Sequence, residues 1–562
     1  MIKKFKKRVF TLKTFLQPNF FGKIFFYLIL LVFPFGQLAR INLANFVPGL
    51  KIQVLDIGIF FFVLNWFLAY RPAPVCLQDE KRQNFLFQKK GSRLVGKATF
   101  LASFIIACAR FPKRQGRARY SEVRNKKIVT PIFFKKFLIF CVIATISLLV
   151  KVQNLSFEEF LVSFFYLLRL INYSFFYLAL LDFFQREKIK ILDIFIGEGV
   201  AISFLALFQY IVLPDTRFLY NFGWDKHYYR AIGSFLDPAF TGILLIFSLN
   251  LFLYKFLQQK KLNFFEFFGF LENLAALVLT FSRLSYLLFF LSLFLFFISS
   301  LRIPRQSFGG DEVGKKKAPR QKASTFFSKQ EETPRFSASS ADRRGLGGFI
   351  ISKVKECAFS KGSNAKDAKT RLFFLKKIKK NFLITFFILL IFGIFLFLSP
   401  KPGGEGVNLL RISSFIARKS SYKEALTIIK DNFWLGVGYN NYRVAQKKYG
   451  FVDNLGFRFS NAAAGTDNSF LFTWATTGVF GLFFYLWFWF AAIKTSYKLL
   501  SSSNLASILF NYLVCLLVSS FVVNSLFYPW IVCWIFCFLA AFTADNLKSI
   551  QPQSCSKQGQ DK

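Results

Sequence analysis

The chain has 562 residues, of which 54% are hydrophobic and 20% aromatic, and its formal net charge is +45. Its apolar residues come in runs of about 17–25, the length a helix needs to cross a hydrocarbon core about 30 Å thick. This pattern excludes an ordinary soluble multidomain protein. The basic residues lie between the apolar runs, as the positive-inside rule requires, so we expect no nucleic-acid binding.

In chain order, about twelve apolar runs are predicted to be transmembrane helices. The stretch 98–111 is too short to span comfortably and is expected to be an interfacial or buried piece of a cytoplasmic insertion. The predicted fold is therefore an all-α polytopic membrane protein with a large extracytoplasmic loop before the tenth helix. The predicted spans are about 21–38, 54–70, 132–150, 159–182, 191–213, 236–256, 264–281, 284–301, 382–399, 468–492, 504–524 and 526–543.

The basic loops predict the orientation. The N-terminus and two loops rich in Lys and Arg are expected in the cytoplasm, as are both chain ends, which gives a multi-pass protein of the cell inner membrane. Residues 302–372 are expected to be a flexible linker, either simply solvated or attracted to lipid headgroups. The predicted divisions are two helices (1–70), a basic insertion (71–131), six helices (132–301), a basic flexible loop (302–381), the ninth helix (382–399), an extracytoplasmic loop (400–467), three helices (468–543) and a cytoplasmic tail (544–562).

The eight cysteines indicate no disulfide framework, because none lies in a loop predicted to face outward. Cys533 and Cys537 are one helical turn apart but lack His or carboxylate neighbours, so neither a metal site nor a cofactor is expected. The basic residues 1–13 precede an apolar run without a small-residue cleavage site and are expected to lead into a first span.

Four charged residues are predicted to gather on the outer side. Arg230 closes the loop 214–235, and Arg283 lies in a tight turn at 282–283 between two apolar runs. The planar fork of arginine suits phosphate, since it donates two parallel hydrogen bonds and keeps its charge. Snorkelling of a long side chain to the membrane interface is the alternative explanation for each arginine taken alone.

The third charged residue, Arg418, lies in the long loop 400–467. It precedes a predicted amphipathic stretch with Tyr422, Ala425, Leu426 and Ile429 on one face. A glycine turn follows, with Gly436 and Gly438 permitting left-handed backbone or a close approach to substrate. No strand precedes this turn, so a nucleotide-binding fold is rejected.

The fourth residue is Asp467, in the sequence Thr466-Asp467-Asn468-Ser469 where the chain re-enters the bilayer. Asp467 and Asn468 both suit the start of a helix as N-caps, and this alone would explain them. The functional alternative is a general base that takes a proton from a hydroxyl group. For that function we expect Asp467 to be partly desolvated.

Other ionisable residues are weaker candidates. His227, the single histidine, is expected to be a surface residue of an outer loop. Arg169, Glu198 and Glu272 fall inside predicted spans, where charge is costly and points to function. Arg169 could pair with Glu198 between neighbouring helices, as a structural pair or as part of a transport path.

The segment around Asp467 resembles the O-antigen ligase and polymerase superfamily. That family has a His-Asn, His-Ser or His-Gln pair, then nine residues, Gly, two residues, and Gly, Thr or Tyr. The spacing fits here, and only the His is replaced. The resemblance covers roughly residues 195–490, and it also includes the Arg230 to Pro238 segment, the Ser282-Arg283 turn and the turn Leu435-Gly436-Val437-Gly438. The chain reads Asp467-Asn468, nine residues through Thr477, then Gly478, Val479-Phe480 and Gly481.

The resemblance implies a metal-independent glycosyltransferase of the GT-C type. It would move a glycan from an undecaprenyl diphosphate carrier to a polysaccharide, lipid or protein acceptor at the outer face of the cytoplasmic membrane. It would not use a nucleotide sugar as donor. Carried over, Arg283 and Arg418 would hold the diphosphate, Arg230 would assist, and Asp467 would replace the family's His as base with inversion at the anomeric carbon. Asn468, Gly436 and Gly438 would contact substrate.

Two other classes of function remain open. A flippase or transporter of lipid-linked glycans would need charged residues along a path through the helices. A non-catalytic scaffold would use the basic insertions to recruit partners. Ligase, polymerase and protein-directed transferase are not distinguished by these motifs.

Overall fold

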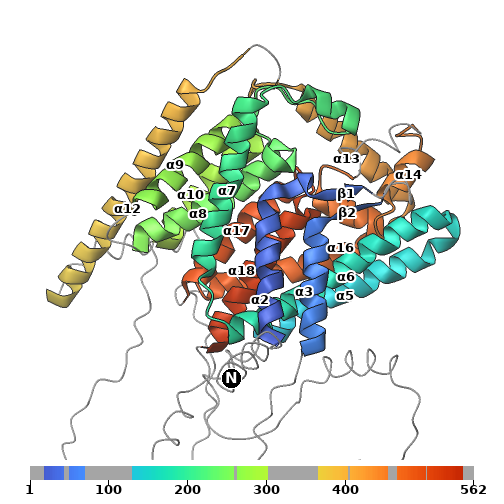
Figure 1. Cartoon of the computed structure of the whole chain (residues 1–562), viewed down its shortest axis with the longest axis horizontal. Coiled ribbons are helices and arrows are strands. Elements are labelled where there is room, and N and C mark those ends of the chain that lie inside the picture. The colour runs from blue at the N-terminus through green and yellow to red at the C-terminus, as the bar shows by residue number, and fades with distance from the viewer. Residues whose placement is uncertain are drawn as a thin grey trace, which may run out of the picture.

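The computed structural model of the chain describes residues 18–42, 50–69, 129–258, 263–300, 365–402, 406–453, 465–500 and 503–548. Each predicted apolar run forms a helix of its own (Figure 1). The helices that correspond to these runs are α2 (Pro18–Val32) with its extension η1 (Phe33–Leu38), α3 (Val54–Ala69), α5 (Val129–Val150), α6 (Phe157–Arg186), α7 (Ile191–Val212), α8 (Pro238–Gln258), α9 (Phe264–Leu279), α10 (Arg283–Ser300), α12 (Ala365–Leu398), α16 (Ser469–Lys498), α17 (Asn504–Ser520) and α18 (Pro529–Lys548).

Eight of the described helices are long and apolar enough to cross a membrane. The chain is therefore a multi-pass membrane protein. Helices α3, α9, α10 and α17 correspond to the other predicted spans but are shorter, so the total of twelve spans stays a prediction. The remaining helical segments are η4 (Val152–Asn154), η5 (Arg217–Phe222), η6 (Gly233–Phe235), α13 (Ser413–Asp431), α14 (Tyr442–Lys448) and η8 (Ser525–Phe527).

Two features differ from the expected all-helical plan. Helix α12 begins at Ala365 rather than near 382, so the end of the loop predicted to be flexible is helical; its Ala, Lys and Leu residues favour this. A short antiparallel hairpin, β1 (Arg40–Asn42) and β2 (Lys51–Gln53), joins α2 to α3. Most of both basic insertions, the stretch 98–111, residues 1–17 and four of the cysteines (Cys76, Cys108, Cys357 and Cys555) lie outside the described residues.

The predicted pair between Arg169 and Glu198 is wrong. Arg169 on α6 instead contacts Asp56 on α3, with 3.0 Å between Nε and Oδ1. The hydroxyl of Tyr173 donates a second hydrogen bond to the same carboxylate at 3.1 Å. Helix α6 packs against α3, whereas Glu198 lies on α7, where it is buried. Glu272 accepts a hydrogen bond from Ser203 at 3.1 Å.

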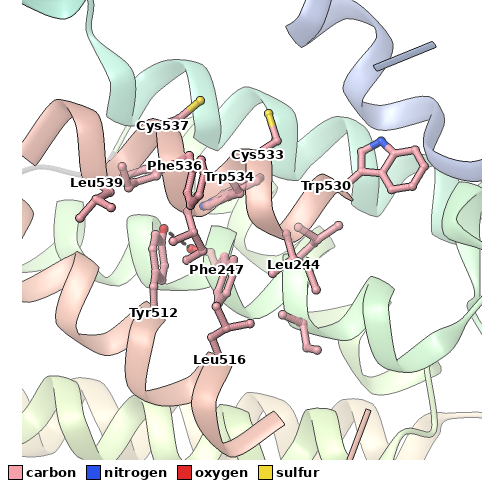
Figure 2. Packing of buried hydrophobic residues seen from close by; sticks show 14 of the residues in the cluster. Leu244, Phe247, Tyr512, Leu516, Trp530, Cys533, Trp534, Phe536, Cys537 and Leu539 are labelled. Carbon is pink, nitrogen blue, oxygen red and sulfur yellow. Dashed lines mark hydrogen bonds between the residues drawn. The ribbon is translucent and has the colours of Figure 1, made fainter. Parts of the chain in front are cut away.

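The core is built around α18, whose membrane-length segment is 78% buried. Figure 2 shows its aromatic side chains among residues of α8 and α17, including the hydrogen bond at 2.7 Å from the Tyr512 hydroxyl to the Phe247 carbonyl. Small residues allow other helices to approach closely. A Cβ on Gly199 of α7 would lie 1.7 Å from the hydroxyl of Ser248 on α8, so these helices meet at glycine, as is common between membrane helices.

The connections that were predicted to face outward meet at one end of the bundle, which we call the site end. The turn between α5 and α6 contacts the α12–α16 connection, where Lys151 Nζ donates to Asn432 Oδ1 at 3.3 Å. The α7–α8 connection is joined to the α9–α10 turn by the backbone hydrogen bond from Ala231 to Leu279 at 2.8 Å. The hairpin β1–β2, α13 and α14 lie at the same end (Figure 1).

Candidate active site

The long loop before α16 folds into α13 and α14, which pack on the first turns of α16. Their shared core includes Ala425 and Ile428 of α13, Tyr442 of α14 and Phe472 of α16. The predicted apolar face of α13 was partly wrong, because Leu426 is 52% exposed and Ile428 is buried in its place. This small core fixes the positions of the loop side chains relative to the helix that begins at Ser469.

The glycine turn docks onto a break in α16. Gly478 adopts φ 69° within that helix, and a Cβ there would lie 1.9 Å from the carbonyl oxygen of Trp434. Hydrogen bonds from Val437 N to the Ala475 carbonyl (2.8 Å) and from Val479 N to the Phe433 carbonyl (3.0 Å) join turn and break. The number of residues between Asp467 and Gly478 therefore sets how far along α16 the glycine turn docks.

The glycines of the turn take part in this packing. Gly436 has φ +70°, and a Cβ on it would lie 2.5 Å from the backbone of Thr476. Gly438 has φ +99°, a backbone conformation in which a residue with a side chain would be strained. The hydroxyl of Ser147 on α5 donates to the carbonyls of both Leu435 and Thr476, at 2.7 and 2.8 Å. Contact of Gly436 and Gly438 with substrate stays a prediction.

Asn468, not Asp467, caps α16. The Asn468 side chain accepts hydrogen bonds from the backbone N–H groups of Phe470 and Leu471, at 2.8 and 3.0 Å. Its amide donates to the Phe521 carbonyl at 3.3 Å. In the described part of the chain, no hydrogen bond reaches the Asp467 carboxylate, so capping does not explain this acidic residue.

Asp467 is held by its backbone and is half-buried. Its N–H donates to the hydroxyl of Ser421 on α13 at 3.2 Å, and that hydroxyl also donates to Thr466. Burial raises the pKa of Asp467, and the charge of Arg418 opposes the rise. Nearby Asp237 and Glu424 add to it. Asp467 is therefore partly buried, as predicted, whereas its function as a base stays a prediction.

One face of α13 gathers the charged groups. Ser414, Arg418 and Ser421 follow the spacing i, i+4 and i+7, which places them on one side of a helix. Ser421 holds Asp467, and Arg418 acts electrostatically on its carboxylate. Ser414 accepts a hydrogen bond from Arg283 Nη2 at 2.5 Å. Arg283, Arg418 and Asp467 are thus brought to one row.

Arg230 is buried and braces the turn that carries Arg283. It donates from Nε to the Thr280 carbonyl at 2.9 Å and from Nη2 to the Phe281 carbonyl at 3.3 Å. Phe281 has φ 45°, so the tight turn is strained and held by these bonds. Burial lowers the pKa of Arg230, and the charge of Arg411 lowers it further.

Asp467 lines a cavity of about 990 Å³ at the site end. Asp225 and Asp237 line it too, whereas Arg283, Arg418 and Arg230 are not among its lining residues. Asp237 caps α8 through hydrogen bonds to its Oδ1 from Ala239 and Phe240. Burial raises the pKa of Asp225 to about 6, with contributions from Asp237 and Asp467. Asp225 and Asp467, which have no capping function and whose pKa values are both raised, therefore face one cavity.

His227 is not the surface residue that was expected. Its side chain is buried, and burial together with Arg230 and Arg411 lowers the pKa of His227 to about 3. Its backbone carbonyl accepts two hydrogen bonds from Thr216, both at 3.1 Å. A histidine with so low a pKa stays neutral at physiological pH.

Several site residues were not found from the sequence. Ser414 and Ser421 could have been recognised from their helical spacing around Arg418. Asp225 carried no motif, and only the fold of its loop brings it to the cavity. Among described residues, no group of three or more His, Cys, Asp or Glu side chains could hold a metal ion, and Cys141, Cys515, Cys533 and Cys537 are free and buried.

Part of the chain is similar to a known protein family. Residues 370–486 match the sequence profile of the family described as O-antigen ligase. The match runs from α12 through α13 and α14 into α16, and it contains Arg418 and Asp467 but neither Arg230 nor Arg283. No curated protein matches the chain. The family implies transfer of lipid-linked glycans in surface polysaccharide synthesis.

Proposed function

Because this chain is a multi-pass membrane protein with an O-antigen ligase domain, we propose that it transfers a glycan from an undecaprenyl diphosphate carrier to an acceptor hydroxyl. The observation that carries this proposal is the state of Asp467. It is half-buried with a raised pKa, faces a cavity of about 990 Å³ and leaves helix capping to Asn468. Such a carboxylate is available for chemistry.

Asp467 acts as the general base. A raised pKa makes a carboxylate a stronger base, and a position in the cavity wall lets it reach a substrate hydroxyl. It takes the proton of the acceptor hydroxyl as that oxygen attacks the anomeric carbon of the donor sugar. The bond between this carbon and the diphosphate oxygen breaks, and the configuration at the carbon is inverted. The electron pair and negative charge leave with the diphosphate.

Arg283 and Arg418 hold the diphosphate. Their fixed charges stabilise the leaving group as its negative charge increases. Electrostatic stabilisation of this kind is usually the largest contribution to catalysis by a preorganised site. The hydrogen bond to Ser414 orients Arg283, and the hydrogen bonds from Arg230 hold the turn from which Arg283 projects. Arg230 is therefore a positioning residue, and the arginines supply without a metal what a cation would supply elsewhere.

The site end faces the extracytoplasmic side of the membrane. The basic loops predicted to be cytoplasmic follow the opposite ends of the helices, which supports this orientation. The donor then approaches from the outer leaflet, and the acceptor is a lipid, a growing polysaccharide or a protein. The lipid tail of the carrier stays in the bilayer, and the cavity binds the sugar part of the substrate.

The test uses the full chain in proteoliposomes with a lipid-linked oligosaccharide donor and a glycan acceptor. Formation of the joined glycan and release of the carrier diphosphate are both measured. Asp467→Asn is expected to abolish both signals, whereas Asp431→Asn, an exposed carboxylate on α13, leaves them intact. Full transfer by Asp467→Asn would rule out the base function. Carrier translocation without transfer by the unaltered protein would indicate a flippase.

A further inference from the structure

The cavity that contains Asp467 has a second, basic wall. Arg40 comes from β1, Lys51 from β2 and Arg443 from α14, and all of them line the cavity. None of these residues lies within the predicted motifs. They come from the N-terminal hairpin and the late loop, so the fold brings together positions that are far apart in the sequence.

The strand register explains why two of these cations are neighbours. Arg40 pairs with Gln53, and Asn42 pairs with Lys51. Alternate residues of a strand point to one face, so Arg40 and Lys51 occupy the same face of the hairpin at diagonal positions. Arg40 also stacks over the ring of Trp224, with 5.1 Å from its guanidinium carbon to the ring centroid.

Gathering like charges in a partly buried place is unfavourable. Burial, together with the charges of Arg40 and Arg443, lowers the pKa of Lys51 to about 8. The acidic residues that line the same cavity are Asp225, Asp237, Asp467, Glu158 and Glu159. Of these, Asp237 caps α8 and Glu159 belongs to the capping box of α6. A bound oxyanion would offset the repulsion among the three cations.

We propose that Arg40, Lys51 and Arg443 form a subsite for a carboxylate or phosphate group on the acceptor glycan. This inference rests on the proposed function and names its acceptor as acidic. Arg283 and Arg418 lie outside the cavity wall and serve the donor diphosphate, whereas the basic wall shares its cavity with the base, Asp467. A cavity of about 990 Å³ has room for several sugar units.

Equilibrium binding tests the subsite without relying on transfer. Full-length protein in nanodiscs is titrated with an oligoglucuronate, a phosphorylated oligoglucoside and a neutral oligoglucoside of equal length. We expect one or both charged ligands to bind about tenfold more tightly than the neutral one, with an advantage that falls as salt increases. The tighter charged ligand identifies the preferred oxyanion. Equal affinity for all three overturns the proposal.

Variants of the three basic residues test whether they cause the preference for charged ligands. The double variant Arg40→Gln/Lys51→Gln and the single variant Arg443→Gln are expected to lose it while binding the neutral ligand normally. Lys430→Gln, an exposed lysine on α13 away from the cavity, should keep it. Size-exclusion chromatography checks folding, and Arg443→Gln decides the matter if the hairpin variant aggregates. A preference that persists in the folded variants overturns the assignment.

Binding and transfer separate the two proposals. Selective binding of charged oligosaccharides without any transfer would contradict the proposed function and leave the subsite in place. Transfer to acidic and neutral acceptors at equal rates, with equal binding, would contradict the subsite and leave the transferase in place.

Discussion

Arg283 donates a hydrogen bond from its guanidinium to the hydroxyl of Ser414, which joins the α9–α10 turn to α13. This bond links a residue inside the matched family segment to one outside it. It orients a charge toward the row that contains Arg418 and Asp467. The alignment of a cationic group before substrate arrives is what makes such a group effective, since no reorganisation is needed during reaction.

Ser414→Ala is expected to lower the transfer rate about tenfold, because a hydrogen bond to a charged group is worth about 1.5–3 kcal/mol. Ser414→Thr keeps the hydroxyl and should retain most activity. Initial rates in proteoliposomes measure both. An unchanged rate for Ser414→Ala beside an inactive Arg283→Ala would show that Arg283 works without this positioning contact.

Asp467→Asn and Asn468→Ala should have opposite effects. Removing the buried charge of Asp467 is expected to abolish at least about 99% of transfer, a typical general-base contribution, and to raise the melting temperature slightly, since burial disfavours the ionised form. Asn468→Ala removes the cap of α16 and should cost about 1 kcal/mol of stability. Thermal unfolding in detergent and transfer rates measure the two effects. A lower melting temperature for Asp467→Asn would mean that this carboxylate stabilises the fold.

The pH dependence of transfer should report Asp467. A base works when deprotonated, so activity is present above its pKa and is lost as pH falls through that pKa. Burial, Asp237 and Glu424 raise the pKa of Asp467, so this loss begins above the range of an ordinary aspartate. Glu424→Gln removes one of these influences and should move the acidic limb to lower pH by a fraction of a unit.

Arg418 acts in the other direction on the same carboxylate. Arg418→Gln is expected to move the acidic limb of the pH profile to higher pH and also to lower the maximum rate, because its charge favours the ionised form of Asp467. Arg418→Lys should largely preserve the limb. Identical limbs in the unaltered protein, Glu424→Gln and Arg418→Gln would assign the titration to another group.

Gly478→Ala should be severely destabilising. An alanine there needs φ near 69° and places its Cβ 1.9 Å from the Trp434 carbonyl, so the docked turn must separate from α16. Gly393→Ala on α12 is the control, since a Cβ there meets nothing within 4 Å. We expect loss of folded protein only for Gly478→Ala, measured by fluorescence-detected chromatography. Comparable yields would show that the break tolerates a side chain.

Much of the fold follows from hydropathy alone, because a helix that crosses lipid must be apolar along its length. The positions of the helices at Phe157–Arg186 and Ser469–Lys498 were predicted in this way. Which helices pack beside them was not predicted. Arg169 contacts Asp56 because α6 packs beside α3, and no period in one sequence tells which helices are adjacent.

The candidate site residues were predicted where chemistry and spacing coincide. Asp467 was singled out as an acidic residue at a helix start, and its separation from Gly478 resembles the family's spacing. In the structure this separation runs from the start of α16 to the break where the glycine turn docks. Which of two adjacent residues caps α16 was not decidable, since Asp and Asn have similar capping preferences and only the backbone selects between them. The burial of His227 and the hairpin carrying Arg40 depend on contacts between distant segments.

The face of α13 that presents Ser414, Arg418 and Ser421 also limits how this segment can change in length. Each residue advances a helix by about 100°, so inserting or deleting one residue between Ser414 and Ser421 would turn one contact away from its partner. Substitutions on the opposite face, such as at exposed Leu426, would leave the row undisturbed. Among homologous chains, the number of residues in this interval should therefore vary less than their identity.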